Sequence, residues 1–166
     1  MVALQLLDGR ALLVILAGNF MTTGWEALET GTHQDHVIAH VVGATVVGYF
    51  KADDALHLSL DIGFIWTIFA DTEMGLLPQS LALKELNVGE AERAALLVEL
   101  QQLHDEETEA AAFAHLTPVP RGCLIEEVRL CAKNELRRLE VLGEMAALVI
   151  YASPITGEMS IEELQI

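Results

Sequence analysis

The clearest pattern in the chain is an alternation of apolar and polar side chains between positions 56 and 68. Every second residue there is large and apolar, and most of the residues between them are small or polar. Side chains two residues apart share one face of a β-strand, so a period of two predicts a strand and not a helix. We therefore expect one strand across Leu56–Phe69, with an apolar face and a polar face.

A second apolar run, Val37–Phe50, precedes this strand and is joined to it by a turn-like tetrapeptide at 51–54. Pairing Phe50 with Ala55 brings the apolar faces of the two runs together. A slip of one residue would mix the two faces, so this register is the self-consistent one. The two runs are therefore predicted to form an antiparallel hairpin.

The first thirty residues predict a second hairpin and a short helix. Asp8-Gly9 is a preferred two-residue turn, and it separates the apolar runs 2–7 and 11–17. A capping-box pattern then favours a short helix of about Gly24–Thr30. Taken together, the first half of the chain is predicted to be an antiparallel β-meander of about four strands.

After Asp71 the pattern favours helices. Pro78 fits the first turn of a helix that reaches about Leu86. The residues from Asn87 then have the pattern of a helix cap and open a longer helix through Leu103 or further, with His115 as the alternative end.

The Thr-Pro-Val-Pro segment at 117–120 is the strongest break in the chain. Beyond it, apolar residues at helical spacing predict a helix across 122–143. The apolar segment 146–152 fits either a strand or an extension of that helix. A cap-like pattern at 160–163 favours a last short helical turn.

A chain of 166 residues fits one domain. We therefore predict a single α+β domain over residues 1–166, in which a β-meander (1–70) packs against a helical second half (77–166). Hydrophobic residues make up 52% of the chain, and counting the 12 glycines as well exceeds the usual share of about 45–50%. Such an excess is typical of a fully covered sheet or of an apolar patch that meets a partner, and it predicts a homodimer.

The charge balance excludes several classes of partner. Acidic residues number 25 against 9 basic ones, which gives a formal net charge of −16. Nucleic acids and anionic membrane surfaces both select basic surfaces, so neither is expected as a partner. The simplest role of the acidity is solubility, and the alternative is attraction of a basic protein partner or a cationic ligand.

The same composition predicts a cytoplasmic protein. The longest apolar runs are shorter than the roughly 18–20 residues of a membrane-spanning helix. No basic segment precedes the first apolar runs, so no export signal is expected. Cys123 and Cys131 are the only cysteines and are predicted to be reduced thiols.

The densest group of metal-ligand residue types is His33, Asp35, His36 and His40. On a helix, the spacings of three and four would place the imidazoles on one side, as a divalent metal such as zinc requires. The strand predicted from Val37 would instead separate His36 from His40 by about 13 Å. No metal or other cofactor is therefore expected, and a zinc site at His33, His36 and His40 is the alternative.

Three further acids are weak candidates for catalysis, alongside Asp35. Asp61 alternates with His57 and Ser59 on one strand face, but no sharp turn presents the serine as a nucleophile. Asp71 and Glu73 follow the predicted strand, where loop acids often serve as ligands or bases.

The absences of a phosphate-binding loop, a dinucleotide fingerprint and zinc-ribbon spacing disfavour the common nucleotide-dependent enzymes. No run of residues resembles a known family. The sequence therefore predicts a non-enzymatic acidic binding or interaction domain that self-associates through an apolar face. Two alternatives stay open: a metal-dependent hydrolase that uses the histidine cluster, and a carrier of a small apolar ligand held between the sheet and the helices.

Overall fold

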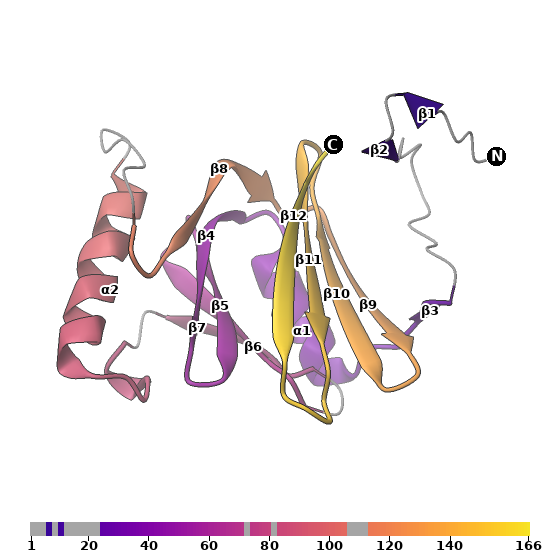
Figure 1. Cartoon of the computed structure of the whole chain (residues 1–166), viewed down its shortest axis with the longest axis horizontal. Coiled ribbons are helices and arrows are strands. Elements are labelled where there is room, and N and C mark those ends of the chain that lie inside the picture. Colours follow the sequence, from indigo (N-terminus) through magenta and orange to yellow (C-terminus); the bar gives the residue numbers. More distant parts are fainter. Residues whose placement is uncertain (1–5, 8–9, 12–23, 72–73, 81–82, 106–112) are drawn as a thin grey trace.

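The computed structural model describes residues 6–7, 10–11, 24–71, 74–80, 83–105 and 113–166. Most of them form two five-stranded antiparallel sheets (Figure 1). The prediction of an α+β domain with a helical second half is wrong, because residues 117–165 form five strands and hold no described helix.

Each sheet is a four-stranded meander with one added strand. The first sheet has the order β7-β6-β5-β4-β8 and the second has the order β12-β11-β10-β9-β3. The strands of the first sheet are β4 (Thr45–Ala52), β5 (Ala55–Leu60), β6 (Phe64–Phe69), β7 (Leu76–Ser80) and β8 (Thr117–Leu124). Those of the second are β3 (Glu26–Ala27), β9 (Glu127–Lys133), β10 (Leu136–Leu142), β11 (Ala146–Ala152) and β12 (Met159–Gln165).

The added strands are exchanged between the two meanders. Strand β3 precedes the first meander in the chain but pairs with β9 of the second. Strand β8 precedes the second meander but pairs with β4 of the first. The chain therefore crosses between the sheets twice, so neither sheet is complete without a strand that is remote in sequence.

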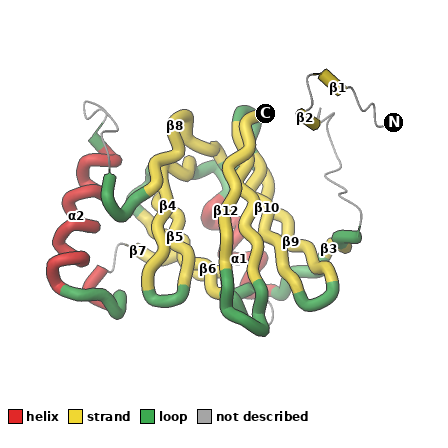
Figure 2. The backbone as a smooth tube through the Cα atoms, viewed as in Figure 1, coloured by secondary structure: helices red, strands yellow, loops and turns green. Residues whose placement is uncertain are grey.

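In the described part of the chain, the helices α1 and α2 accompany the sheets (Figure 2). Helix α1 (Thr32–Val41) contributes Val37 and Val41 to the core between the sheets and packs against β7. Helix α2 (Glu90–His104) covers the outer face of the first sheet, where Leu96 and Leu100 pack against Phe50 of β4. A short 3-10 helix, η1 (Leu83–Glu85), precedes α2. Among the described residues, no helix combines the length and apolarity needed to cross a bilayer.

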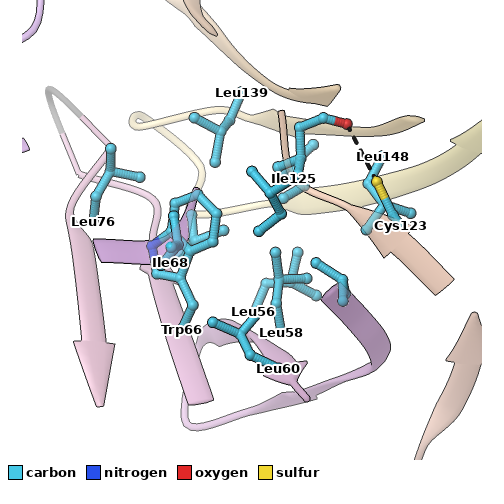
Figure 3. Packing of buried hydrophobic residues seen from close by; sticks show 14 of the residues in the cluster. Leu56, Leu58, Leu60, Trp66, Ile68, Leu76, Cys123, Ile125, Leu139 and Leu148 are labelled. Atoms are coloured by element: carbon cyan, nitrogen blue, oxygen red, sulfur yellow. Dashed lines mark hydrogen bonds between the residues drawn. The ribbon is translucent and has the colours of Figure 1, made fainter. Parts of the chain in front are cut away.

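The core lies between the inner faces of the two sheets (Figure 3). Its fully buried members come from both meanders, and burying each large apolar side chain contributes about 1.5–3 kcal/mol. They include Leu56, Leu58, Leu60, Trp66, Ile68, Leu139, Leu148 and Ile150.

The alternating stretch 56–68 forms two strands and not one. Residues 61–63 make a turn in which Gly63 has a φ of +83°, a conformation that glycine adopts at little cost. Across the hairpin, Leu58 pairs with Trp66 and Leu56 with Ile68. Even-numbered residues pair with even-numbered ones, so the alternation passes through the turn without a break. The period of two was therefore correct for the apolar face, while the predicted single strand was wrong.

The run Val37–Phe50 is also divided. Helix α1 ends at Val41, Gly43 turns the chain with a φ of +89°, and β4 begins only at Thr45. Strand β4 does pair with β5, but Ala52 and not Phe50 is the partner of Ala55. The shift of two residues leaves the side chains from Gly48 to Ala52 on their predicted faces. A bulge between Val46 and Gly48 changes the faces before it, so that Val46, and not Val47 as predicted, lies opposite Leu60 in the core.

The β4–β5 connection is a two-residue turn. Asp53 and Asp54 both have positive φ, of 52° and 55°. Two successive positive φ values are typical of the type I′ turn, whose twist matches that of the flanking strands.

Other predictions near the ends of the chain have mixed outcomes. Leu6–Leu7 pairs with Arg10–Ala11, which confirms the first hairpin as far as the described residues reach. The helix predicted at Gly24–Thr30 is wrong, because Glu26–Ala27 pairs with β9. Segment 146–152 is the strand β11, and the predicted turn at 160–163 lies within β12.

Of the three longer helices predicted after Asp71, one is confirmed and two are wrong. The long helix after Asn87 is confirmed as α2, with Gly89 at its N-cap. The helix around Pro78 is wrong: Pro78 lies in β7, at a sheet edge, where the missing N–H removes no internal hydrogen bond. The helix predicted at 122–143 is also wrong, because β9 and β10 pair across a turn in which Asn134 has a φ of 51°.

Candidate functional site

The predicted metal ligands lie on a helix after all. Helix α1 places His33, His36 and His40 at spacings of three and four, and all three are exposed. The helix begins after Gly31, whose N–H donates to Gln34 Oε1 at 2.9 Å. In the described part of the chain, however, no three His, Cys, Asp or Glu side chains gather in a way that could hold a metal ion. A metal at this cluster stays a prediction for elemental analysis to test.

The predicted catalytic acids lie on separate elements. The Asp35 carboxylate accepts a hydrogen bond from the Thr30 hydroxyl beside the start of α1. The Asp61 carboxylate, in the β5–β6 turn, accepts the N–H of Thr45 at 2.8 Å and so fixes the start of β4. Asp71 is exposed just after β6, and Glu73 lies outside the described residues.

His57 is a buried residue with both ring nitrogens occupied. Its Nε2 lies 3.0 Å from the carbonyl oxygen of Ala52, and its Nδ1 lies 2.9 Å from the Thr67 hydroxyl. The ring also stacks on Phe50, with centroids 4.8 Å apart. Burial lowers the pKa of His57, which favours the neutral ring that donates from Nε2 and accepts at Nδ1. These contacts make His57 part of the packing. Ser59 lies within β5, in regular strand conformation, and not on a sharp turn that would present it as a nucleophile.

Two cavities lie along one side of α2. The smaller, of about 310 Å³, lies between α2 and the β5–β6 hairpin, and the larger, of about 450 Å³, lies between α2 and η1. Leu97 lines both cavities. We call this surface the α2 groove; its helix side is formed by Glu90, Arg93, Ala94, Leu97, Leu100, Gln101 and His104. These positions are three or four apart, so they share one helix face.

The walls of the groove are mainly apolar, and their polar groups are at the two ends. Phe64 and Ile65 of β6 form the wall opposite Leu97 and Leu100 in the smaller cavity, with Ser59, Gln101 and His104 beside them. Leu97 and Phe64 keep 41% and 38% of their surface exposed. Large apolar side chains exposed side by side are typical of a surface that meets a ligand or partner.

Arg93 fixes the wall of the larger cavity. Its Nε donates to the carbonyl of Leu83 at 2.9 Å, and its Nη2 donates to the carbonyl of Leu86 at 2.8 Å. The chain before α2 is thereby tied to the first turns of the helix. The groove is therefore built on backbone that hydrogen bonds hold in place.

Glu99 ties α2 to the chain that leads into β8. Its carboxylate accepts the N–H groups of Ala114, His115 and Leu116 at 2.8, 3.0 and 2.8 Å. Burial of Glu99 opposes its ionisation, but these hydrogen bonds and one from the His115 ring outweigh burial and lower its pKa. Ionised Glu99 therefore stabilises the fold at pH values above its unfolded-state pKa, and this stabilisation is lost as the pH falls through the folded-state pKa.

We expect Glu99→Gln to lower the free energy of unfolding at neutral pH by about 1–3 kcal/mol, because one carboxylate oxygen and its charge are lost to backbone donors. The difference from the unmodified protein should shrink as the pH falls, since protonation of Glu99 produces a similar loss. Denaturant unfolding over a series of pH values measures both effects. Glu92→Gln, at an exposed position of the same helix, is the control and should change little. A pH-independent loss in Glu99→Gln would contradict this account.

A second group of perturbed side chains lies on the outer face of the second sheet. Arg138 and Glu140 of β10 are only 3% and 2% exposed, and Arg138 Nη2 lies 2.6 Å from Glu140 Oε1. The two side chains form a close ion pair that is buried in the protein. Trp25 covers the pair, with Arg138 Cζ 4.6 Å from its ring centroid, and Tyr151 lies beside Trp25 at 6.0 Å between centroids.

Burial dominates the electrostatics of this pair. It raises the pKa of Glu140 although Arg138 and Arg129 act in the opposite direction. Burial likewise raises the pKa of Tyr151 and of the Cys131 thiol. Perturbed groups often mark functional sites, but the carboxylate and guanidinium here are closed to solvent. We interpret the pair as structural.

Sequence reasoning missed both features. The groove joins residues from β5, β6 and α2 that only the tertiary fold brings together. The ion pair has a local signal, since Arg138 and Glu140 are two apart and share one face of a strand. The helix predicted at 122–143 concealed it. Comparison of the chain with protein-family models, curated proteins and solved structures finds no match.

Proposed function

We propose that this chain is a non-enzymatic binding domain that holds a small apolar molecule in the α2 groove. The observation that carries the proposal is the pair of cavities, of about 310 and 450 Å³, that are both lined by Leu97. Sites for small molecules are typically apolar clefts of about 300–1,000 Å³ with a few polar groups at their margins.

The polar margin indicates the kind of molecule. His104 and Gln101 lie at one end of the groove, and Lys84, Glu90 and Arg93 lie at the other. An apolar body along Leu97 and Leu100 would leave a polar group of the ligand within reach of the imidazole or the amide. A largely hydrocarbon or aromatic molecule with one hydrogen-bonding group fits this arrangement best.

The test uses a matched pair of variants on adjacent residues. Leu97→Glu places a carboxylate against both cavities, whereas Val98→Glu changes a neighbour that is also exposed but lines neither cavity. With the uncharged fluorophore N-phenylnaphthylamine as probe, we expect Leu97→Glu to weaken binding about tenfold or more, because a charge must then be desolvated. Val98→Glu should bind the probe as the unmodified chain does. No saturable binding to the unmodified chain, or equal loss in both variants, would refute the proposal.

Self-association is the rival use of the same surface. Ile62, Phe64 and Leu97 are large, apolar and exposed around the groove, which is how a homodimer interface would begin. Sedimentation of the same two variants distinguishes ligand binding from self-association. A dimer that dissociates in Leu97→Glu but not in Val98→Glu, without saturable probe binding, would assign the groove to a second copy of the chain and overturn the ligand proposal.

A further inference from the structure

Strand β12 is a long edge strand of the second sheet, and among the described strands it pairs with β11 alone (Figure 1). All seven residues of Met159–Gln165 pair with β11 in one continuous register. The other three edges of the two sheets are protected in ways that proteins commonly use. Strand β7 carries Pro78, β8 carries Pro118 and Pro120, and β3 is two residues long. By contrast, β12 has no proline, no lysine and no bulge.

The ladder shows which backbone groups of β12 point outward. Ile166 donates its N–H to Met145, so the even-numbered residues of the strand bond to β11. The odd-numbered residues Ile161, Glu163 and Gln165 therefore direct their N–H and C=O groups away from the sheet. The carbonyl of Met159 points the same way and accepts a hydrogen bond from Lys51 Nζ at 2.6 Å.

Acidic side chains surround this edge. Glu162 and Glu163 follow one another on β12, so they lie on opposite faces of the sheet. Asp53 and Asp54, at the tip of the β4–β5 turn, line a cavity of about 350 Å³ beside Met159, together with Lys51. An added strand would thus meet acid on both of its faces and at one end.

These charges also act against pairing between two copies of β12. Only odd-numbered residues can bond outward, so the antiparallel registers that use three or more of them in each copy are centred on Ile161, Glu162 or Glu163. Centring the pair on Glu162 or on Glu163 sets that residue against its own copy, which is destabilising. Centring it on Ile161 requires the carbonyl of Met159, which already accepts Lys51.

We propose that β12 receives an extended basic segment of a partner protein as a sixth strand of the second sheet. The residues facing Glu162 and Glu163 are basic, and those facing Ile161 and Leu164 are apolar, which gives the pattern apolar-basic-basic-apolar. Backbone hydrogen bonds supply affinity, and the two charge pairs select the segment. This surface is distinct from the α2 groove, and the inference does not depend on the groove's function.

The experiment titrates the full chain with the peptide Thr-Val-Lys-Arg-Val-Thr and follows amide chemical shifts. We expect saturable binding with the largest shifts in β12. The peptide with Glu-Asp in place of Lys-Arg should bind at least about tenfold more weakly. In the variant Glu162→Lys with Glu163→Lys, the preference should reverse.

Two further arms test the strand geometry itself. Ile161→Pro removes an outward N–H but no bond to β11, so the fold should persist while peptide binding weakens about tenfold. A peptide N-methylated on its bonding edge makes the same test on the unmodified chain, should the variant not fold. If neither change weakens peptide binding, charge attraction alone accounts for the contact, and the proposal is overturned. Formation of a β12-linked dimer in place of peptide binding would overturn it as well.

Discussion

Replacing Arg138 with methionine is expected to lower the free energy of unfolding by about 3–5 kcal/mol, because it leaves the Glu140 carboxylate buried without its counter-charge. Methionine retains much of the apolar volume of the arginine stem, so the loss reports on charge more than on packing. Denaturant unfolding followed by circular dichroism measures the change. Arg121→Met, at an exposed position of β8, is the matched control and should change stability by about 0.5 kcal/mol or less.

The pH dependence of this loss has a definite sign. Burial raises the pKa of Glu140, so folding favours its protonated form. The stability that this residue contributes is present at acidic pH and is lost as the pH rises through the folded-state pKa. Removing Arg138 takes away a group that lowers this pKa, so the variant should be most destabilised at alkaline pH and least at acidic pH. A loss that does not vary with pH, or one no larger than that of Arg121→Met, would show that the pair is solvated.

Removing both members of the pair should restore stability. In Arg138→Met combined with Glu140→Leu no charge remains to be desolvated, and replacement of a buried pair by apolar residues is often neutral or stabilising by about 1–4 kcal/mol. The double variant should therefore be at least as stable as Arg138→Met alone and close to the unmodified chain. If the loss of stability in the double variant equals the sum of the losses in Arg138→Met and Glu140→Leu, the two residues act independently.

Predictions from the sequence were correct where one periodic pattern reported on one helix or on one face of the strands. The cap and apolar spacing after Asn87 identified α2, and the alternation in 56–68 identified the residues on the apolar face. The turn inside that alternation could not be detected from the period, because a three-residue loop keeps even positions on one face of both strands. Length gives the better signal, since 14 residues exceed the usual length of a strand, about 3–10 residues.

The second half was misread because its strands are short or buried on both faces. Strand β11 is apolar throughout and so carries no period that separates a strand from a helix. Strands β9 and β10 alternate, but each spans only seven residues, and apolar residues spaced by four across the pair imitate a helix. Asn134 at the turn between them was the available signal.

The candidate site was less accessible to sequence reasoning than the fold. The three predicted histidines lie on one helix, but the described residues do not gather into a group that could hold a metal ion. The strand predicted from Val37 is wrong over residues 37–41, because they belong to α1. The α2 groove depends on which face of the first sheet α2 covers, and no pattern within one element contains that information. The only sequence signal for the acidic side chains around β12 was the net charge of −16, which shows that acids are in excess but not where they lie.

A second prediction with a large expected effect tests the hairpin at residues 55–69. Leu58→Ala is expected to lower the free energy of unfolding by about 2–5 kcal/mol, because Leu58 is fully buried between Tyr49 and Trp66 and its loss leaves a cavity. Ile62→Ala should cost about 0.5 kcal/mol or less, because Ile62 is 51% exposed in the turn. Denaturant unfolding of the two variants gives the comparison directly.

The pair is informative because the alternation alone assigns both residues to the same apolar face. A single continuous strand would bury Ile62 as deeply as Leu58 and make the two losses similar. The turn at 61–63 makes them differ several-fold. Similar losses of about 2 kcal/mol or more in both variants would therefore contradict the hairpin, and with it the placement of Phe64 and Ile65 in the wall of the α2 groove.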